Sequence, residues 1–286
     1  MIIVDFNAIC ISNIFVQKMN LEEDLIRHMV LNSLRMYRTR FKKDYGELVI
    51  ATDSRSWRKD YYPEYKAARK IGRQKSTMDW EKAFNIITMI REELKENFPY
   101  KVIHIDGCEA DDIIGTLVEN THEFGNYENV LIVSSDKDFV QLQKYDNVAQ
   151  FSPMKKNFIV EKNPRLYLMQ HILKGDSGDG VPNVLSDDDV FINEDKRQKP
   201  LSKKKMDEII NDISHEDEHT ACHASWYRNY SRNKKLIDLS ETPNDIKNKI
   251  INNFTEQEAQ QNKGKVFPYL TAKNCTQLIE SVQEFI

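Results

Sequence analysis

Met1-Ile2-Ile3-Val4-Asp5-Phe6 is an apolar run with an acid near its end. The first predicted strand covers Ile2–Phe6, and three later runs of similar composition predict strands over Leu48–Thr52, Lys101–Ile105 and Val130–Ser134. Each run is rich in Val and Ile and almost continuously apolar, which is typical of strands that are covered on both faces. We therefore expect a sheet that lies between two layers of helices.

Amphipathic segments lie between these strands and predict the helices. They cover Leu21–Phe41, Met78–Asn97 and Ala110–Thr121, and the first places residues such as Leu25 and Met29 at helical spacing. An alternating β-α-β-α order calls for a mostly parallel central sheet. The predicted fold class is therefore α/β, with helices flanking the sheet.

The sequence predicts two parts of unequal size. Residues 1–175 form an α/β core, which includes a basic segment at about 54–78, a hairpin-like stretch at Asn157–Lys162 and a helix over Pro164–Leu173. Residues 176–286 are polar, charged and helix-prone, and predict a smaller, mainly helical part. Within that part, 186–199 is the segment expected to be a mobile loop.

Composition indicates a globular chain outside the membrane. The 286 residues are 40% hydrophobic and 30% charged, which allows a full hydrophobic core. No apolar run has the length of a membrane span and no basic leader follows Met1, so we expect a cytoplasmic protein. Four scattered cysteines fit free thiols in a reducing compartment. The net charge of −4 argues against a general nucleic-acid binder, although the charge is unevenly distributed.

Acidic residues follow all four predicted strands. They are Asp5, Asp53, Glu109, Asp111, Asp112, Asp136 and Asp138. Because the carboxyl ends of parallel strands share one edge, these side chains are expected to converge on one crevice. Neighbouring carboxylates resist joint ionisation, and Mg²⁺, which prefers hard oxygen ligands, removes that cost. Asp176 and Asp179 supply ligands for a second cation, as in two-metal hydrolysis of phosphodiesters.

A structural alternative exists for each acid. A lone Asp after a strand is more often a helix cap or a turn former than a ligand. The run Glu109-Ala110-Asp111-Asp112 also suits a helix N-terminus. Because four separate strand ends carry the same feature, a metal site is the interpretation that accounts for all of them.

Cations and aromatic rings are interleaved between Asp53 and Met78. Eight Lys and Arg residues stand there against only Asp60 and Glu64, together with Trp57, Tyr61, Tyr62 and Tyr65. One interpretation is a solvated basic helix whose aromatic residues face the core. Beside a carboxylate cluster we favour binding of single-stranded nucleic acid, with phosphates paired to cations and bases stacked on rings.

Six motifs together resemble the 5′-nuclease family, which includes flap endonucleases and the 5′-exonuclease domains of bacterial DNA polymerases. Its phage ribonuclease H branch is the most similar. The motifs are Ile3-Val4-Asp5-Phe6, Ala51-Thr52-Asp53, Pro63-Glu64-Tyr65-Lys66-Ala67-Ala68-Arg69, Glu109-Ala110-Asp111-Asp112, Ser135-Asp136-Lys137-Asp138-Phe139 and Gly175-Asp176-x-x-Asp179. They occur in family order, and the combination is specific although each motif alone is weak.

The resemblance implies a 5′→3′ exonuclease and flap endonuclease that acts on RNA–DNA and DNA–DNA duplexes and removes RNA primers during replication. Hydrolysis would depend on two Mg²⁺ ions, for which Mn²⁺ substitutes, and would leave a 5′-phosphate. Implied partners are forked or flap DNA, RNA–DNA hybrid, a single-stranded DNA-binding protein and a sliding clamp. A monomer is expected.

The resemblance also assigns roles to individual residues. The first metal is surrounded by Asp5, Asp53, Glu109, Asp111 and Asp136, and the second is held by Asp138, Asp176 and Asp179, with Asp112 in the outer shell. The implied catalytic residues are Asp5, Asp53, Lys66 and Asp136. Lys66 would reach the scissile phosphate with help from Arg58 and Arg69.

The chain departs from the family after Asp179. Many members continue with a glycine-containing helix-hairpin-helix that binds duplex DNA and a monovalent cation, whereas here Val181-Pro182-Asn183-Val184 runs into the acidic stretch 186–189. We therefore do not carry the potassium site over, and assign duplex binding to Lys203, Lys204, Lys205 and the helices beyond. Asp187–Asp189 is interpreted as a surface or capping run.

Other interpretations remain open. His215, His219 and His223 recur every four residues and could hold zinc, but the acids around them favour a solvated helix. A magnesium phosphatase or a PIN-type ribonuclease also gathers carboxylates at strand ends, yet needs neither the basic segment nor Gly-Asp-x-x-Asp. A catalytically inactive nucleic-acid-binding module is the non-enzyme alternative.

Overall fold

Strand β1 (Ile2–Asp5) lies inside the central sheet and pairs in parallel with β2 (Leu48–Ala51) on one side and β4 (Val130–Val133) on the other. The computed structural model describes residues 1–17, 21–121, 127–215 and 224–286. The sheet order is β3-β2-β1-β4-β5-β6, where the remaining strands are β3 (Lys101–Ile103), β5 (Val148–Ser152) and β6 (Asn157–Ile159). All neighbours are parallel except β5 and β6, which form an antiparallel hairpin at the edge.

Both faces of the sheet are covered, because alternate residues of β1 enter two different cores. Ile2 and Val4 pack with α1 (Phe6–Val16), α2 (Glu23–Tyr45) and α5 (Trp80–Asn97). Ile3 packs on the other face with α6 (Ala110–Glu119) and α11 (Asn244–Glu256). This is the three-layer α/β architecture that the continuous apolar strands predicted, and the predicted fold class is confirmed.

The element boundaries differ from the prediction where one apolar stretch contains two elements. The predicted strand through Phe6 ends at Asp5, because the Asp5 carboxylate caps α1, a helix that we did not predict. Helix α2 runs on to Tyr45, and Gly46 ends it with a φ of 82°. Strand β5 was not predicted either, although its partner β6 lies within the expected hairpin.

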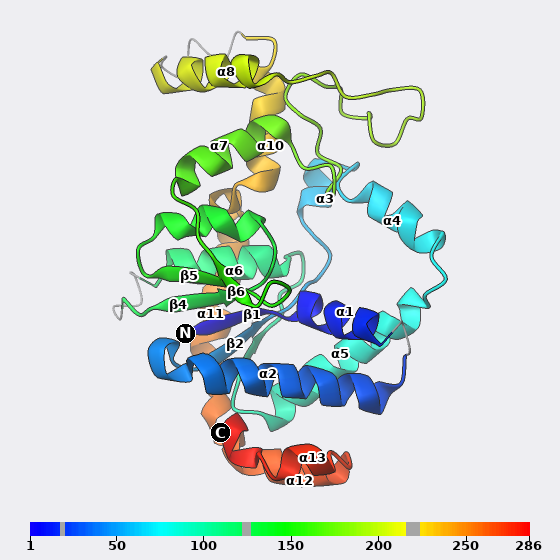
Figure 1. Ribbon diagram of the computed structural model, residues 1–286, viewed down its shortest axis with the longest axis vertical. Helices are drawn as coiled ribbons and strands as arrows, with labels where there is room; N and C mark the ends of the chain where they lie inside the picture. Colours follow the sequence, from blue (N-terminus) through cyan, green and yellow to red (C-terminus); the bar gives the residue numbers. More distant parts are fainter. Residues whose placement is uncertain (18–20, 122–126, 216–223) are drawn as a thin grey trace.

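The predicted basic segment forms an arm beside the sheet (Figure 1). It contains α3 (Arg58–Tyr61) and α4 (Ala67–Gln74), and then joins α5. No residue of α4 is buried, so its side chains face solvent. The arm is therefore an exposed, cationic element whose two ends are anchored in the core.

In the described parts of residues 176–286, the chain forms turns and irregular segments up to residue 202, with an isolated bridge between Asp176 and Val181, and is mainly helical from Lys203 onward. Helices α7 (Pro164–Lys174), α8 (Lys203–His215) and α10 (Tyr227–Ile237) lie at one end of the molecule, and α12 (Val266–Ala272) and α13 (Thr276–Ile279) at the other (Figure 1). Short 3₁₀ turns complete the connections at Leu239–Glu241, Ala259–Lys265 and Val282–Phe285.

The last turn of the chain belongs to the same core as the sheet. Phe285 is fully buried, and its ring contacts Phe98 edge-on at a centroid distance of 5.6 Å. Tyr269 packs on the same Phe98 ring at 5.2 Å. The chain thus wraps around the α/β layers instead of ending in a separate core. In the described ranges, no helix has both the length and the apolar character needed to span a bilayer.

We expect Phe285→Ala to lower the free energy of unfolding by about 3–5 kcal/mol, since it removes a fully buried aromatic ring and leaves a cavity. Urea denaturation measures the change. The matched control is Phe267→Ala, whose ring is 53% exposed and should shift stability by less than about 0.5 kcal/mol. Equal effects of the two substitutions would contradict the packing of the last turn against Phe98.

Candidate active site

Asp5 is oriented by two neighbouring elements. Its Oδ1 accepts a hydrogen bond from the backbone N–H of Ala8 at 3.2 Å, which caps α1. Its Oδ2 accepts one from the Ser134 hydroxyl, just beyond β4, at 3.0 Å. The alternative role of a helix cap therefore applies to only one oxygen of Asp5. The carboxylate as a whole lies at the carboxyl edge of the sheet.

Asp53 connects β2 with the start of α6. Its Oδ1 accepts a hydrogen bond from the backbone N–H of Ala110 at 2.8 Å. Asp111 follows in the first turn of the same helix. The positive end of the α6 dipole therefore lies beside both acids and favours their ionised forms.

Seven of the nine acids predicted as metal ligands line one cleft of about 270 Å³ at the strand ends. They are Asp5, Asp53, Asp111, Asp136, Asp138, Asp176 and Asp179. The same cleft is lined by the cationic side chains of Lys66, Arg69 and Arg73 and by the rings of Trp80 and Phe84. The convergence expected from the strand order is thus present in the structure.

Protein cations offset the acids at the strand ends only in part, since Lys66 acts on Asp53 and Asp111 without pairing with either. Within the described residues, no Lys or Arg forms an ion pair with Asp5, Asp53, Asp111 or Asp136. Burial, together with the neighbouring charge of Asp53, raises the pKa of Asp5 to about 7. Burial and the charge of Asp136 likewise raise the pKa of Asp138 to about 7. The carboxylates repel one another as long as no cation lies between them.

These residues fit hard divalent cations. Carboxylate oxygens are the ligands that Mg²⁺ and Mn²⁺ prefer, and the cleft offers them from several strand ends at once. A cation would also supply the counter-charge that the surrounding protein does not provide. The oxygen donors of the cleft and the raised pKa values of Asp5 and Asp138 therefore both indicate a site for a divalent cation.

The cationic side is built around Lys66, Glu109 and Asp179. Lys66 Nζ forms ion pairs with Glu109 and, at 3.5 Å, with Asp179. The Tyr65 hydroxyl oxygen lies 3.0 Å from Glu109 Oε2 and 2.9 Å from Asp179 Oδ2, and can donate its proton to either. Arg69 pairs with the other oxygen of Asp179, Oδ1. Burial alone would raise the pKa of Glu109, but Lys66 and Arg58 outweigh it and lower that pKa to about 2. Glu109 does not line this cleft, but lines an adjoining pocket that shares Asp53, Lys66 and Arg69 with it.

The arm and the Gly175–Gly180 loop are held together by their backbones. Lys66 has a left-handed φ of 57°, and its N–H donates to the Asp179 carbonyl at 2.7 Å. Gly175 has a φ of 70°, and a Cβ there would lie 2.3 Å from the Val181 carbonyl oxygen. A glycine is therefore required at the start of Gly-Asp-x-x-Asp, because the chain turns back on itself at once.

The structure places Arg58 and Asp112 away from the cleft, and the predicted role of Arg58 is wrong. Arg58 does not face nucleic acid: it is 2% exposed, and its guanidinium bonds to Asp112, Glu109 and the Leu236 carbonyl. Asp112 is fully buried and does not line the cleft. Its oxygens accept hydrogen bonds from Arg58, Trp57, Thr242 and the Glu109 backbone N–H, a position that is compatible with the outer-shell role predicted for it but not with direct contact to an ion in the cleft. Sequence shows which residue types are present but not toward which side an arm residue points.

The predicted stacking rings of the basic segment are mostly structural as well. Tyr62 and Tyr65 are buried at 4% and 3% exposure, and the Trp57 indole donates to Asp112. Only Tyr61, at 50%, exposes much of its ring among these four residues. The rings that do line the cleft are Trp80 and Phe84, over which the Arg73 guanidinium lies at 5.3 Å and 5.0 Å. We missed them because they belong to α5, outside the segment chosen by charge.

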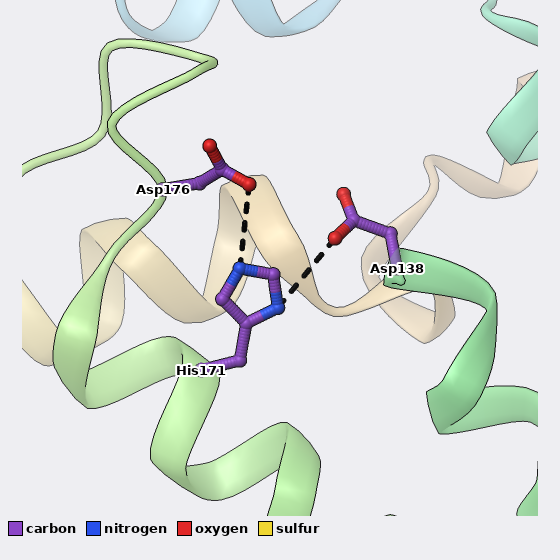
Figure 2. Close-up of side chains that lie close together, drawn as sticks. All are labelled: Asp138, His171 and Asp176. Carbon is purple, nitrogen blue, oxygen red and sulfur yellow. Dashed lines mark ion pairs between the residues drawn. The ribbon is translucent and has the colours of Figure 1, made fainter. Parts of the chain in front are cut away.

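His171 was also missed. It lies on α7, one turn before Gly175, between Asp138 and Asp176 (Figure 2). Nδ1 is 3.6 Å from Asp138 and Nε2 is 3.4 Å from Asp176. A single His inside an amphipathic helix carries no pattern that sequence inspection would select.

The remaining candidates lie away from the cleft. Lys203, Lys204 and Lys205 are exposed on the first turn of α8, where Lys205 pairs with Glu208 at 3.3 Å. In the acidic run 187–189, Asp188 pairs with Arg228 and Arg232, and Asp189 with Lys196 at 2.8 Å. The proposed zinc-binding histidines His219 and His223 lie outside the described residues, as does the side chain of His215.

Comparison with known proteins identifies the family. The family model of the 5′-3′ exonuclease N-terminal resolvase-like domain matches residues 1–167, and that of the T4 RNase H C-terminal region matches residues 162–285. The chain belongs to the 5′-3′ exonuclease family. The resemblance predicted from its motifs, including the phage ribonuclease H branch, is confirmed, and with it the assignment to the nucleases.

Individual relatives support this membership. Ribonuclease H of Enterobacteria phage T4 is 33% identical over 99% of this chain and 95% of its own length. A flap endonuclease Xni of Shewanella is 33% identical over 46% of this chain and 49% of its own. Among solved structures, a bacteriophage T5 flap endonuclease complex with DNA and metal ions superimposes with a TM-score of 0.65 at 19% identity, covering 91% and 98% of the two chains.

In this exonuclease, Arg58→Ala should lower the free energy of unfolding by about 3–5 kcal/mol, because it leaves Asp112 buried without its cation. Chemical denaturation gives the value. Arg55→Ala, which breaks only the exposed pair with Asp60, is the control and should leave stability unchanged. If Arg58→Ala instead kept full stability and lost only DNA affinity, the structural role assigned to Arg58 would be wrong.

Cation binding should tighten as pH rises. Asp5 and Asp138 have pKa values raised to about 7, so the cation-free folded chain holds protons that the unfolded chain releases at a pH of about 4. The stability of the cation-free chain therefore falls as pH rises through that window, and ionised ligands become available to a cation. Titration calorimetry with Mn²⁺ at about pH 6 and about pH 8 measures the change in affinity.

The control for this titration is Asp44→Asn, which removes an exposed carboxylate on α2 and should leave the pH dependence intact. An affinity that is the same at both pH values in the unsubstituted chain would contradict the raised pKa values.

Proposed function

We propose that this chain is a divalent-cation-dependent 5′→3′ exonuclease and flap endonuclease that hydrolyses phosphodiesters of RNA–DNA and DNA–DNA duplexes. The observation that carries the proposal is the cleft itself. Asp5, Asp53, Asp111 and Asp136 form no ion pair with Lys or Arg of the described residues, and Lys66, Arg69 and Arg73 line the same cleft. Cations bound at these acids, together with the three basic side chains, would neutralise the charge of a phosphodiester in the cleft.

We assign the first cation to Asp5, Asp53, Asp111 and Asp136, with Glu109 behind them, and the second to Asp138, Asp176 and Asp179. Mg²⁺ is the proposed ion, and Mn²⁺ has the same preference for oxygen ligands. When bound, two such ions lower the pKa of a water and stabilise charge on the attacking and leaving oxygens. The helix N-terminus beside Asp53 and the Ser134 hydroxyl hold the ligands in place.

Lys66 is the residue best placed to hold the scissile phosphate. Burial lowers its pKa, but Asp179 and Glu109 outweigh burial and raise it, so the side chain remains a cation at neutral pH. Its backbone bond to Asp179 fixes where the arm meets the cleft. Arg69 adds a second cation at the same edge. Both side chains can neutralise phosphate charge without leaving the protein surface.

The substrate extends beyond the cleft along exposed cations. The arm carries Lys70 and Arg73 on α4, which we assign to the 5′ strand, and Lys203–Lys205 on α8 to the duplex. Because the phage T4 relative is a ribonuclease H and other relatives are flap endonucleases, we propose RNA primers and flaps at replication forks as the substrates. The protein would act as a monomer, with a single-stranded DNA-binding protein and a sliding clamp as partners.

A forked duplex labelled at its 5′ end tests the proposal. We expect cleavage at the 5′ end or the junction with Mg²⁺ and none with EDTA. Cleavage of a structured RNA without any 5′ end preference would favour a PIN-type ribonuclease, and binding without cleavage would favour an inactive module. Either result would overturn the proposed function.

Asp136→Asn should reduce cleavage by about a hundredfold or more while it leaves binding of the forked duplex within about twofold, because the substitution removes a ligand charge and no phosphate contact. Gel-shift and cleavage assays on one substrate separate the two effects. The control, Asp212→Asn, changes an exposed acid on α8 and should leave both unchanged. Undiminished turnover of Asp136→Asn would refute its role.

A further inference from the structure

His171 stands between two carboxylates that we assign to the second cation. Its side chain is 15% exposed, and it projects from α7 toward Asp138 at the start of the 3₁₀ helix Asp138–Lys144 and toward Asp176 beyond the helix end (Figure 2). The three side chains offer ligand atoms that lie within 4.8 Å of one another. The group therefore combines two oxygen donors with one nitrogen donor.

The separation at Nδ1 is too long for a hydrogen bond and is close to that of two ligands of one ion. Nδ1 lies 3.6 Å from Asp138 Oδ1, and Nε2 lies 3.4 Å from Asp176 Oδ2. Ordinary N–H···O hydrogen bonds span about 2.7–3.2 Å. Two ligand atoms that are each about 2.1 Å from one ion lie about 3.0–3.5 Å apart. The Nδ1–Asp138 separation of 3.6 Å is slightly longer than this range, so a small approach of the two side chains would bring both to one cation.

The two carboxylates are not equivalent. Asp176 Oδ1 accepts a hydrogen bond from the backbone N–H of Asp179 at 3.0 Å, and its Oδ2 faces Nε2. The Asp138 carboxylate accepts no hydrogen bond from the described residues, so its oxygens are open to a cation. Metal-binding imidazoles commonly donate their second N–H to a carboxylate, which orients the ring. Asp176 occupies that position behind His171, in addition to its proximity to the ion.

We infer that His171 is a nitrogen ligand of the second cation, and that this makes the site selective for Mn²⁺ and similar transition-metal ions over Mg²⁺. Nδ1 binds the ion beside Asp138, while the Nε2–H is held by Asp176. Imidazole suits first-row transition metals, whereas Mg²⁺ prefers an all-oxygen shell. The first site, built from carboxylates alone, has no such bias. The inference rests on the proposed function, because it names the ion at one of its two sites.

The test uses Mn²⁺ as the probe on the full chain and reads binding directly. Pulsed electron paramagnetic resonance detects imidazole nitrogen that is bonded to Mn²⁺. We expect this nitrogen coupling in the unsubstituted chain and its loss in His171→Gln, which keeps a donor near Asp176 but removes the Nδ1 ligand. His104→Gln is the control, because His104 contacts Thr52 and Arg91 outside the cleft and its loss should leave the coupling intact.

Calorimetry on the same variants gives the selectivity. His171→Gln should weaken Mn²⁺ binding at the second site by about tenfold or more, and change Mg²⁺ binding by less than about threefold. A thermal melt checks that the variant is folded.

The outcomes separate the two proposals. If the unsubstituted chain binds Mn²⁺ without nitrogen coupling, or if His171→Gln retains the coupling, the assignment of His171 is overturned and the metal-dependent nuclease stands. If the chain binds no divalent cation and cleaves in EDTA, both proposals fail.

Discussion

Repulsion between carboxylates at the carboxyl edge of the sheet is the constraint on which the rest of the site depends. Parallel strands bring Asp5, Asp53 and Asp136 to one edge, and the start of α6 adds Asp111. Protein cations neutralise some of these acids and not others. Glu109, in the adjoining pocket, and Asp179, in the cleft, are neutralised by Lys66. The acids at the centre of the cleft have no such partner among the described residues, so ions from solvent would neutralise them. Their repulsion therefore makes the cleft a candidate cation site.

The cationic arm meets this cleft through contacts that the local sequence does not determine. Lys66 reaches its place because its backbone N–H is held by the Asp179 carbonyl, and because Gly180 lets the two segments approach, with a Cβ there 3.0 Å from the Glu64 carbonyl oxygen. Tyr65 then bridges Glu109 and Asp179 from inside the protein. Three segments that are far apart in sequence thus set one another's positions. A change in the Gly175–Gly180 loop would move Asp179 and Lys66 together.

The sheet and the acidic edge could be predicted because both follow from short-range patterns. Continuous apolar runs identify buried strands, and an acid at the end of such a run must lie at the sheet edge. Helix α1 was missed because its apolar sequence continues that of β1 without a break, and only the cap at Asp5 separates the two. Arg58 was misassigned because charge alone does not tell whether an arm residue points to solvent or to the core. His171 required knowledge of how α7 packs beside Asp138, which is a tertiary contact.

The unequal charge of the cleft also explains why the net charge of −4 says little about function. A phosphate that approaches Lys66 and Arg69 is attracted by them and repelled by the acids opposite, which lie in the same small volume. Cations at the acids remove that repulsion, and a bound phosphate in turn supplies oxygen ligands that complete the coordination of such ions. Cation binding and substrate binding therefore strengthen each other by reciprocal linkage. The average charge of the chain is irrelevant to this coupling, since it depends only on which charges share the cleft.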